Sequence, residues 1–139
     1  MSVDQRPVLC VLLTPGMGGP HAWALRLRAR LSTHRVLIGC AGAPGGSILD
    51  PDCVFDGSAE LAAWLSLVNP AVVLPNWLWW SYEVCAALKA EGHDLQVVGY
   101  CRSDDEDTYY APLAAYEGAI DWLVAVSYTH LTLPTTERV

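Results

Sequence analysis

A glycine-rich segment, PGMGGPH, follows an apolar run near the N-terminus and is the first place where the sequence could do chemistry. Glycines let the backbone approach a ligand closely, and the N-terminus of a following helix offers free N–H groups to an anion. Gly16, Met17, Gly18 and Gly19 are therefore predicted to face a ligand. The alternative is a tight turn between a strand and a helix that holds no ligand.

The glycine segment departs from two known phosphate-binding patterns. In the dinucleotide fingerprint G-x-G-x-x-G, Gly16 and Gly18 match, but His21 stands at the position of the third glycine. No acidic residue ends the next apolar run, VLIG, where a dinucleotide-binding fold places the ligand of the ribose. The GK[ST] of a Walker loop is also absent. These departures argue against NAD and ATP as ligands.

A polar segment, CRSDDEDTYY, follows another apolar run, VVGY. Arg102 stands where that predicted strand ends, and its guanidinium could hold a phosphate or a sugar hydroxyl. Ser103 and Glu106 match the capping box S-x-x-E, and aspartates suit the positive end of a helix dipole. Asp105 and Asp107 could also form a metal-binding DxD pair, but acidic residues are common in a first helical turn, so no metal site is predicted.

The segment LPNWLWW places an amide and several indole rings directly after a predicted strand. Asn76 suits an N-cap, and its position at a strand end also makes it a candidate for substrate binding. Trp77, Trp79 and Trp80 cannot all point to one core face. An exposed ring there could stack on a sugar or a lipid-like acceptor.

These segments all follow apolar runs of strand length, and helical patterns separate the runs. We expect strands over 8–13, 35–40, 53–55, 71–74, 95–100 and 122–126, and helices over 21–32, 58–68, 77–89 and 103–119. We expect Ser58 to cap the second of these helices and Gly92 to follow the end of the third. Continuous apolar strands that alternate with helices predict an α/β fold with a doubly wound, parallel, Rossmann-like sheet. Ligands bind such sheets at the carboxyl ends of the strands.

The composition narrows the class of protein. With 139 residues and 53% apolar residues, the chain is long and apolar enough for one globular domain. A net charge of -7 argues against nucleic acid as a partner. The five cysteines form no CxxC pair and predict buried free thiols in a reducing compartment. No signal peptide or membrane-spanning run is recognisable, so a cytoplasmic location is expected, although peripheral membrane contact stays open.

Two blocks of the sequence resemble the N-terminal domain of bacterial glycosyltransferases of family 4, which have the GT-B fold. One block is VVGYCRSDDEDTYYAPLAAYEGAIDWLVAVS, and the other is TPGMGGPHAWALRLRARL. The resemblance implies two Rossmann-like domains with a cleft between them. The N-terminal domain mainly holds the acceptor, and the C-terminal domain mainly holds the nucleotide-sugar. The paired acidic motif of the family belongs to the second domain and is not in this chain.

The resemblance also implies roles for individual residues. The glycine loop would lie near the donor diphosphate, and Ser103 and Asp104 would lie at the substrate cleft. The position before SDD is often a histidine in this family and faces the transferred sugar, so Arg102, which stands there, is the candidate catalytic residue. The family retains the configuration of the anomeric carbon and usually needs no essential metal. No cofactor is therefore expected, and the nucleotide-sugar is a substrate.

The C-terminal residues 126–139 depart from the strand–helix pattern. Residues 126–135, VSYTHLTLPT, resemble one reading frame of a transposase-based sequencing adapter. We therefore expect residues 1–125 to form the acceptor-side domain, 126–139 to be a non-native tail, and the natural protein to continue. The leading hypothesis is a glycosyltransferase fragment that is inactive alone. One alternative is a stand-alone binding subunit that pairs with a donor-binding chain, and a weaker one is a nucleotide-dependent oxidoreductase.

Overall fold

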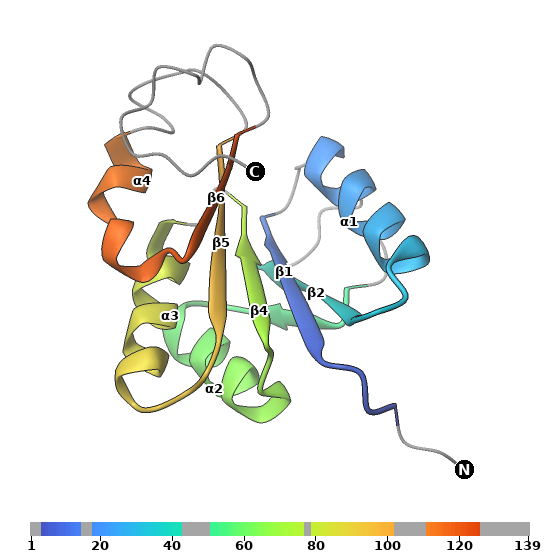
Figure 1. Ribbon diagram of the computed structural model, residues 1–139, viewed down its shortest axis with the longest axis horizontal. Coiled ribbons are helices and arrows are strands. Elements are labelled where there is room, and N and C mark those ends of the chain that lie inside the picture. The colour runs from blue at the N-terminus through green and yellow to red at the C-terminus, as the bar shows by residue number, and fades with distance from the viewer. Residues whose placement is uncertain (1–3, 15–17, 43–50, 77–78, 102–110, 126–139) are drawn as a thin grey trace.

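The computed structural model describes residues 4–14, 18–42, 51–76, 79–101 and 111–125 (Figure 1). Strands and helices alternate along these residues. In chain order they are β1 (Val8–Leu13), α1 (Gly18–Arg30), β2 (Arg35–Ala41), β3 (Cys53–Phe55), α2 (Ser58–Val68), β4 (Val72–Pro75), α3 (Trp79–Ala90), β5 (Gln96–Cys101), α4 (Ala111–Ala115), a 3-10 helix (Glu117–Ala119) and β6 (Trp122–Ala125).

The strands form one parallel sheet in the order β3-β2-β1-β4-β5-β6. The chain runs outward from β1 to β3, returns through α2 to pair β4 with β1, and then runs outward to β6. The predicted α/β fold with a Rossmann-like, doubly wound parallel sheet is confirmed. The direction of winding reverses between β1 and β4, which is the switch point of the sheet.

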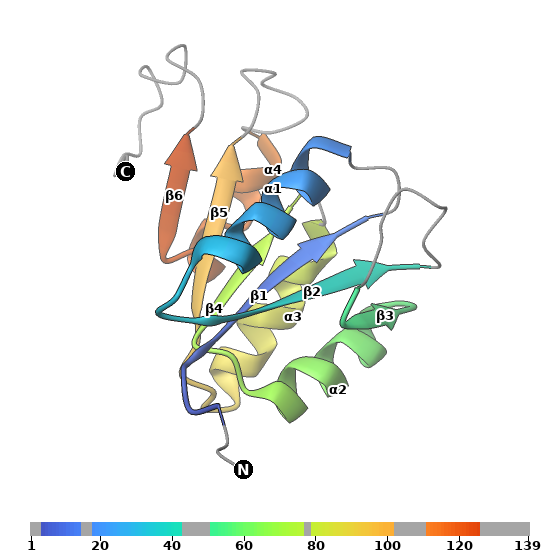
Figure 2. The same cartoon turned by 90° about the vertical axis from the view of Figure 1, so that its right-hand side faces the viewer.

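Apolar side chains cover both faces of the central strands, as the continuous apolar runs predict. Cys10 and Leu12 of β1 belong to a cluster that α2, α3 and α4 cover. Leu9, Val11 and Leu13 point the other way and pack with residues of α1. Figures 1 and 2 show α1 on one side of the sheet and the other three helices on the opposite side.

The bounds of α2 agree with the sequence prediction, whereas α1 ends at Arg30 instead of residue 32. Within the described part of the predicted helix 103–119, α4 ends at Ala115 and a separate 3-10 helix follows.

The start of α1 and the N-cap of α2 also differ in detail. α1 begins at Gly18, so the last glycines of the loop belong to the helix. The N-cap of α2 is Gly57 rather than Ser58, which is the first helical residue. Gly57 has a φ of 100°, a conformation that glycine adopts without strain. Gly92, with a φ of 101°, follows α3 as predicted, and its N–H donates to the carbonyl of Lys89 at 3.0 Å.

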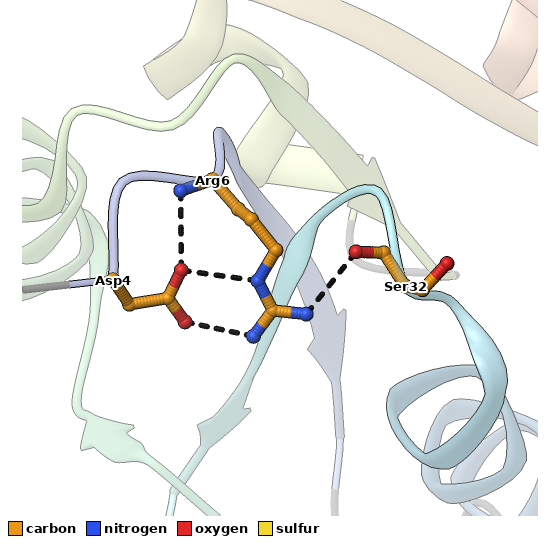
Figure 3. A network of polar contacts seen from close by, with 3 residues as sticks. All are labelled: Asp4, Arg6 and Ser32. Atoms are coloured by element: carbon orange, nitrogen blue, oxygen red, sulfur yellow. Dashed lines mark hydrogen bonds and ion pairs between the residues drawn. The ribbon is translucent and has the colours of Figure 1, made fainter.

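The segment before β1 is held by one arginine (Figure 3). The Arg6 guanidinium donates to both carboxylate oxygens of Asp4, at 3.0 and 2.7 Å, and to the carbonyl of Ser32 at 3.3 Å. Hydrogen bonds from Arg6 lower the pKa of Asp4 to about 2. The chain entering β1 is thereby tied to the turn between α1 and β2.

The cysteines whose side chains the structure describes are free thiols. Cys10, Cys40 and Cys85 are buried, and Cys53 is half-buried on β3. Burial raises the pKa of Cys10 and of Cys85 to about 12. In the part of the chain that the structure describes, no helix combines the length and apolar character needed to cross a bilayer.

Candidate functional site

The switch point between β1 and β4 is the place where open α/β sheets bind ligands. β1 is followed by Thr14 and the glycine segment, and β4 is followed by Asn76. The two strand ends are joined by the backbone, because the N–H of Asn76 donates to the carbonyl of Leu12 at 3.1 Å. The fold therefore brings two of the segments singled out from the sequence to one edge of the sheet.

Gly18 and Gly19 form the first turn of α1 at this edge. The first N–H groups of a helix have no partner within the helix and can bind an anion. Pro20, the third helical residue, has no N–H, and its fixed φ suits a first turn. His21 follows with only 6% of its surface exposed. Gly18 and Gly19 thus follow β1 as the sequence predicts, but they belong to α1 rather than to the loop before it, and His21 packs largely inside the protein.

Asn76 lies at the switch point and is only 1% exposed. Its side-chain Nδ2 donates to the carbonyl of Leu74 at 3.4 Å. Together with its backbone bond to β1, this contact holds the end of β4 in place. Asn76 follows the end of β4, as the sequence predicts, and its burial favours a supporting role over the predicted direct contact with a substrate.

Several candidate residues lie outside the described residues. These are Gly16, Met17, Arg102, Ser103 and Asp104, together with the aspartates of the alternative DxD pair. The tail 126–139 also lies outside them. Their predicted roles remain predictions.

The two described tryptophans of the LPNWLWW segment begin α3 and point to different partners. Trp79 stacks on Tyr82, with ring centroids 6.0 Å apart, and Tyr82 stacks on Tyr116 at 5.6 Å. Trp80 meets Phe55 edge to face, with centroids 6.0 Å apart and an angle of 84° between the rings. Trp79 therefore extends an aromatic column, whereas Trp80 reaches the ends of β2 and β3.

Trp80 lines a pocket of about 430 Å³ that the sequence did not predict. The pocket lies at the carboxyl ends of β2 and β3, on the same edge of the sheet as the switch point. Its described lining residues are Ala41, Gly42, Phe55, Asp56, Gly57, Ser58 and Trp80. The sequence could have indicated this pocket, because the polar segment DGS follows the predicted strand CVF. A strand of this length gives a weak prediction of what lies at its end.

The pocket combines aromatic and acidic character. Asp56 is exposed, and its backbone N–H donates to the carboxylate of Glu60 at 2.7 Å. The Glu60 carboxylate therefore contacts the backbone of a residue that lines the pocket. The described lining residues include no lysine, arginine or histidine. The pocket can accept hydrogen bonds and offer a ring face. The start of α2 at Gly57 and Ser58 also lines it, but the carboxylates of Asp56 and Glu60 beside that helix end oppose a further negative charge.

Comparisons with known proteins leave the family open. Neither a scan against protein-family models nor a search of curated proteins gives a match to this chain.

Proposed function

We propose that this chain is the acceptor-side domain of a GT-B glycosyltransferase, which moves a sugar from a nucleotide-sugar to an acceptor hydroxyl. The strand order β3-β2-β1-β4-β5-β6, with glycines opening α1 at its switch point, carries the proposal. Such a sheet is the building unit of the GT-B fold that the sequence resembles. Transfer would require a second domain that binds the donor, so this chain is expected to be inactive alone.

The residues at the edge of the sheet would act mainly through electrostatics and positioning. The N–H groups at the start of α1, which Gly18 and Gly19 open, would stabilise the departing diphosphate. Arg102, which follows the end of β5, would add a positive charge near the transferred sugar. Buried Asn76 would hold the two central strand ends in register.

The oxidoreductase alternative receives less support from the strand ends. A dinucleotide-binding sheet places an acidic residue after its second strand to bind the ribose. Here Ala41 ends β2 and Gly42 follows it. A stand-alone binding subunit would have the same sheet and the same glycine turn, and only the presence of a second domain separates it from the leading proposal.

Isothermal titration calorimetry tests where the donor binds. The purified chain is titrated with UDP-glucose, GDP-mannose and NAD in separate experiments. We expect affinities no tighter than millimolar for both nucleotide-sugars, because one wall of the cleft belongs to the other domain. Submicromolar binding of a nucleotide-sugar would contradict the proposal, and tight binding of NAD would establish the oxidoreductase alternative instead.

The reading frame beyond codon 125, sequenced from the genomic source, tests the second domain. An uninterrupted frame that encodes a second Rossmann-like domain with paired glutamates would support the glycosyltransferase. A stop codon at that point would leave the stand-alone binding subunit as the better description.

A further inference from the structure

Two aromatic rings, Phe55 and Trp80, line the pocket at the ends of β2 and β3, and part of the Trp80 surface stays exposed. Phe55 is buried, whereas Trp80 is only partly buried. The two rings meet at 84°, so Phe55 can cover at most one face of the Trp80 indole. An indole face at the rim of a pocket is a surface on which an apolar ring face can stack.

Polar groups lie beside these two rings. Asp56 is exposed and lines the pocket, and the Ser58 hydroxyl lies two residues further along the same turn. A carboxylate accepts strong, charge-assisted hydrogen bonds, and a hydroxyl can both donate and accept. The volume of about 430 Å³ lies within the range of about 300–1,000 Å³ typical of small-molecule sites.

The charges of the pocket select among ligands. A nucleotide would bring phosphates close to the carboxylates of Asp56 and Glu60, and the described lining includes no basic side chain. The first turn of α2 also lines the pocket, but the Glu60 carboxylate already lies at that helix end. Like charges at such distances repel each other. A neutral sugar avoids this cost, because it offers one apolar ring face to an indole and hydroxyl groups to a carboxylate.

We propose that this pocket is a subsite that binds one neutral sugar ring of a carbohydrate acceptor, an inference that rests on the proposed function. The ring stacks on the indole of Trp80, and its hydroxyl groups donate to the carboxylate of Asp56. The switch point between β1 and β4, where the donor diphosphate would lie, is on the same edge of the sheet as this subsite at the ends of β2 and β3, and β1 is the strand next to β2 on that side. The acceptor would therefore approach the donor from the β3 side.

Ligand-observed saturation-transfer NMR tests the subsite with the methyl glycosides of glucose, galactose, mannose and N-acetylglucosamine. We expect at least one glycoside to bind the chain at millimolar concentration. Trp80→Ala should weaken that binding about fivefold to tenfold, and Asp56→Ala should weaken it about tenfold. Trp80→Phe keeps an aromatic ring beside Phe55 and should retain binding within about threefold.

Matched controls separate stacking and charge from general damage. Trp122→Ala removes an indole that is 47% exposed on β6, the opposite edge strand, and Asp94→Ala removes an exposed carboxylate before β5. Both should leave binding unchanged. Thermal melts by circular dichroism check that each variant is folded, and Asp56→Ala, an exposed substitution, keeps the test decisive if Trp80→Ala does not fold.

The outcomes distinguish this inference from the proposed function. Absence of binding by all four glycosides, or binding that neither Trp80→Ala nor Asp56→Ala weakens, would overturn the subsite. Displacement of the glycoside by AMP or UMP would also overturn it, because the pocket would then take nucleotides. If a glycoside binds as expected but the reading frame beyond codon 125 stops, the sugar subsite stands and the glycosyltransferase proposal fails.

Discussion

Asp52 and Ile38 are joined by two hydrogen bonds that act in opposite directions. The N–H of Asp52 donates to the carbonyl of Ile38 at 2.8 Å, and the N–H of Ile38 donates to the Asp52 carboxylate at 2.7 Å. Asp52 immediately precedes β3, and Ile38 lies in the middle of β2. The pairing of β2 with β3 begins at Gly39 and Cys53, one residue after Ile38 and Asp52. The Asp52 carboxylate therefore accepts the buried N–H of Ile38, which would otherwise lack a partner on that side of β2.

The same arrangement recurs at the opposite edge of the sheet. Asp121 immediately precedes β6, its N–H donates to the carbonyl of Val97 at 2.9 Å, and its carboxylate accepts the N–H of Val97 at 2.8 Å. Each carboxylate also pairs with a helical cation, Arg28 at 3.5 Å for Asp52 and Lys89 for Asp121. We call each aspartate with its strand partner an aspartate clip. The clips fix where the two edge strands begin.

Loss of either clip should destabilise the fold. Asp52→Ala leaves the buried N–H of Ile38 without its acceptor and should lower the free energy of unfolding by about 1–3 kcal/mol in urea titrations. Asp52→Asn keeps an oxygen acceptor and should cost less than Asp52→Ala. The exposed Asp94→Ala serves as the control, with a change within about 0.5 kcal/mol. Equal losses for the alanine and asparagine variants at position 52 would contradict the clip.

The two clips should act independently, because β1 and β4 separate their strands. The double variant Asp52→Ala/Asp121→Ala should show the sum of the two single losses to within about 0.5 kcal/mol. A double-mutant cycle in urea measures the difference. A coupling energy above about 1 kcal/mol would mean that the edges of the sheet unfold together through a shared contact.

Gly39 allows the middle of β2 to pack against α2. A Cβ at this position would lie 2.7 Å from Cζ3 of Trp64 and 3.0 Å from Cε1 of Phe55. Gly39→Ala should therefore destabilise the protein by about 1–3 kcal/mol through overpacking. Gly118→Ala is the matched control, since a Cβ there would meet no atom within 4 Å. Thermal or urea unfolding compares them, and equal stability of the two variants would contradict this account of the packing.

The thiols should differ in reactivity. Burial raises the pKa of Cys10 and of Cys85 to about 12, so their reactive thiolate forms are scarce at pH 8 and solvent does not reach them. Burial also raises the pKa of Cys53, but its side chain is half-buried rather than buried. Among Cys10, Cys40, Cys53 and Cys85, iodoacetamide should therefore alkylate Cys53 first, as peptide mapping by mass spectrometry would record. Cys10 and Cys85 should react only in urea. Modification of Cys10 before Cys53 in native buffer would contradict the packing of β1.

The N-terminal ion pair should weaken in acid. Hydrogen bonds from Arg6 lower the pKa of Asp4 from 3.8 to about 2. Because the folded-state pKa is below the unfolded value, the contribution of this pair to stability is present above about pH 4 and is lost as the pH falls toward 2. An NMR titration of the Asp4 carboxyl carbon should give a midpoint near 2. Arg6→Ala should move the midpoint toward 3.8, and an unchanged midpoint would show that Arg6 is not the cause.

Local patterns in the sequence were sufficient to predict the class of fold. Unbroken apolar runs such as VLCVLL must be buried on both faces, and their alternation with helical segments leaves a parallel sheet as the arrangement that covers them. The glycine segment after β1 and Asn76 after β4 were predicted at the ligand-binding edge for the same reason. The α2 cap was predicted wrongly, because Ser58 has cap chemistry but Gly57 adopts the positive φ that the turn requires.

Only the tertiary structure decided which distant residues share a site. The sequence could not show that Trp80, which follows β4, reaches the ends of β2 and β3, because that contact depends on the strand order and on the packing of α3 beside α2. Nor could it show that Asp52 and Asp121 each bind a neighbouring strand. Periodicity reports which face of an element is buried, whereas the neighbour that covers the face is set by long-range packing.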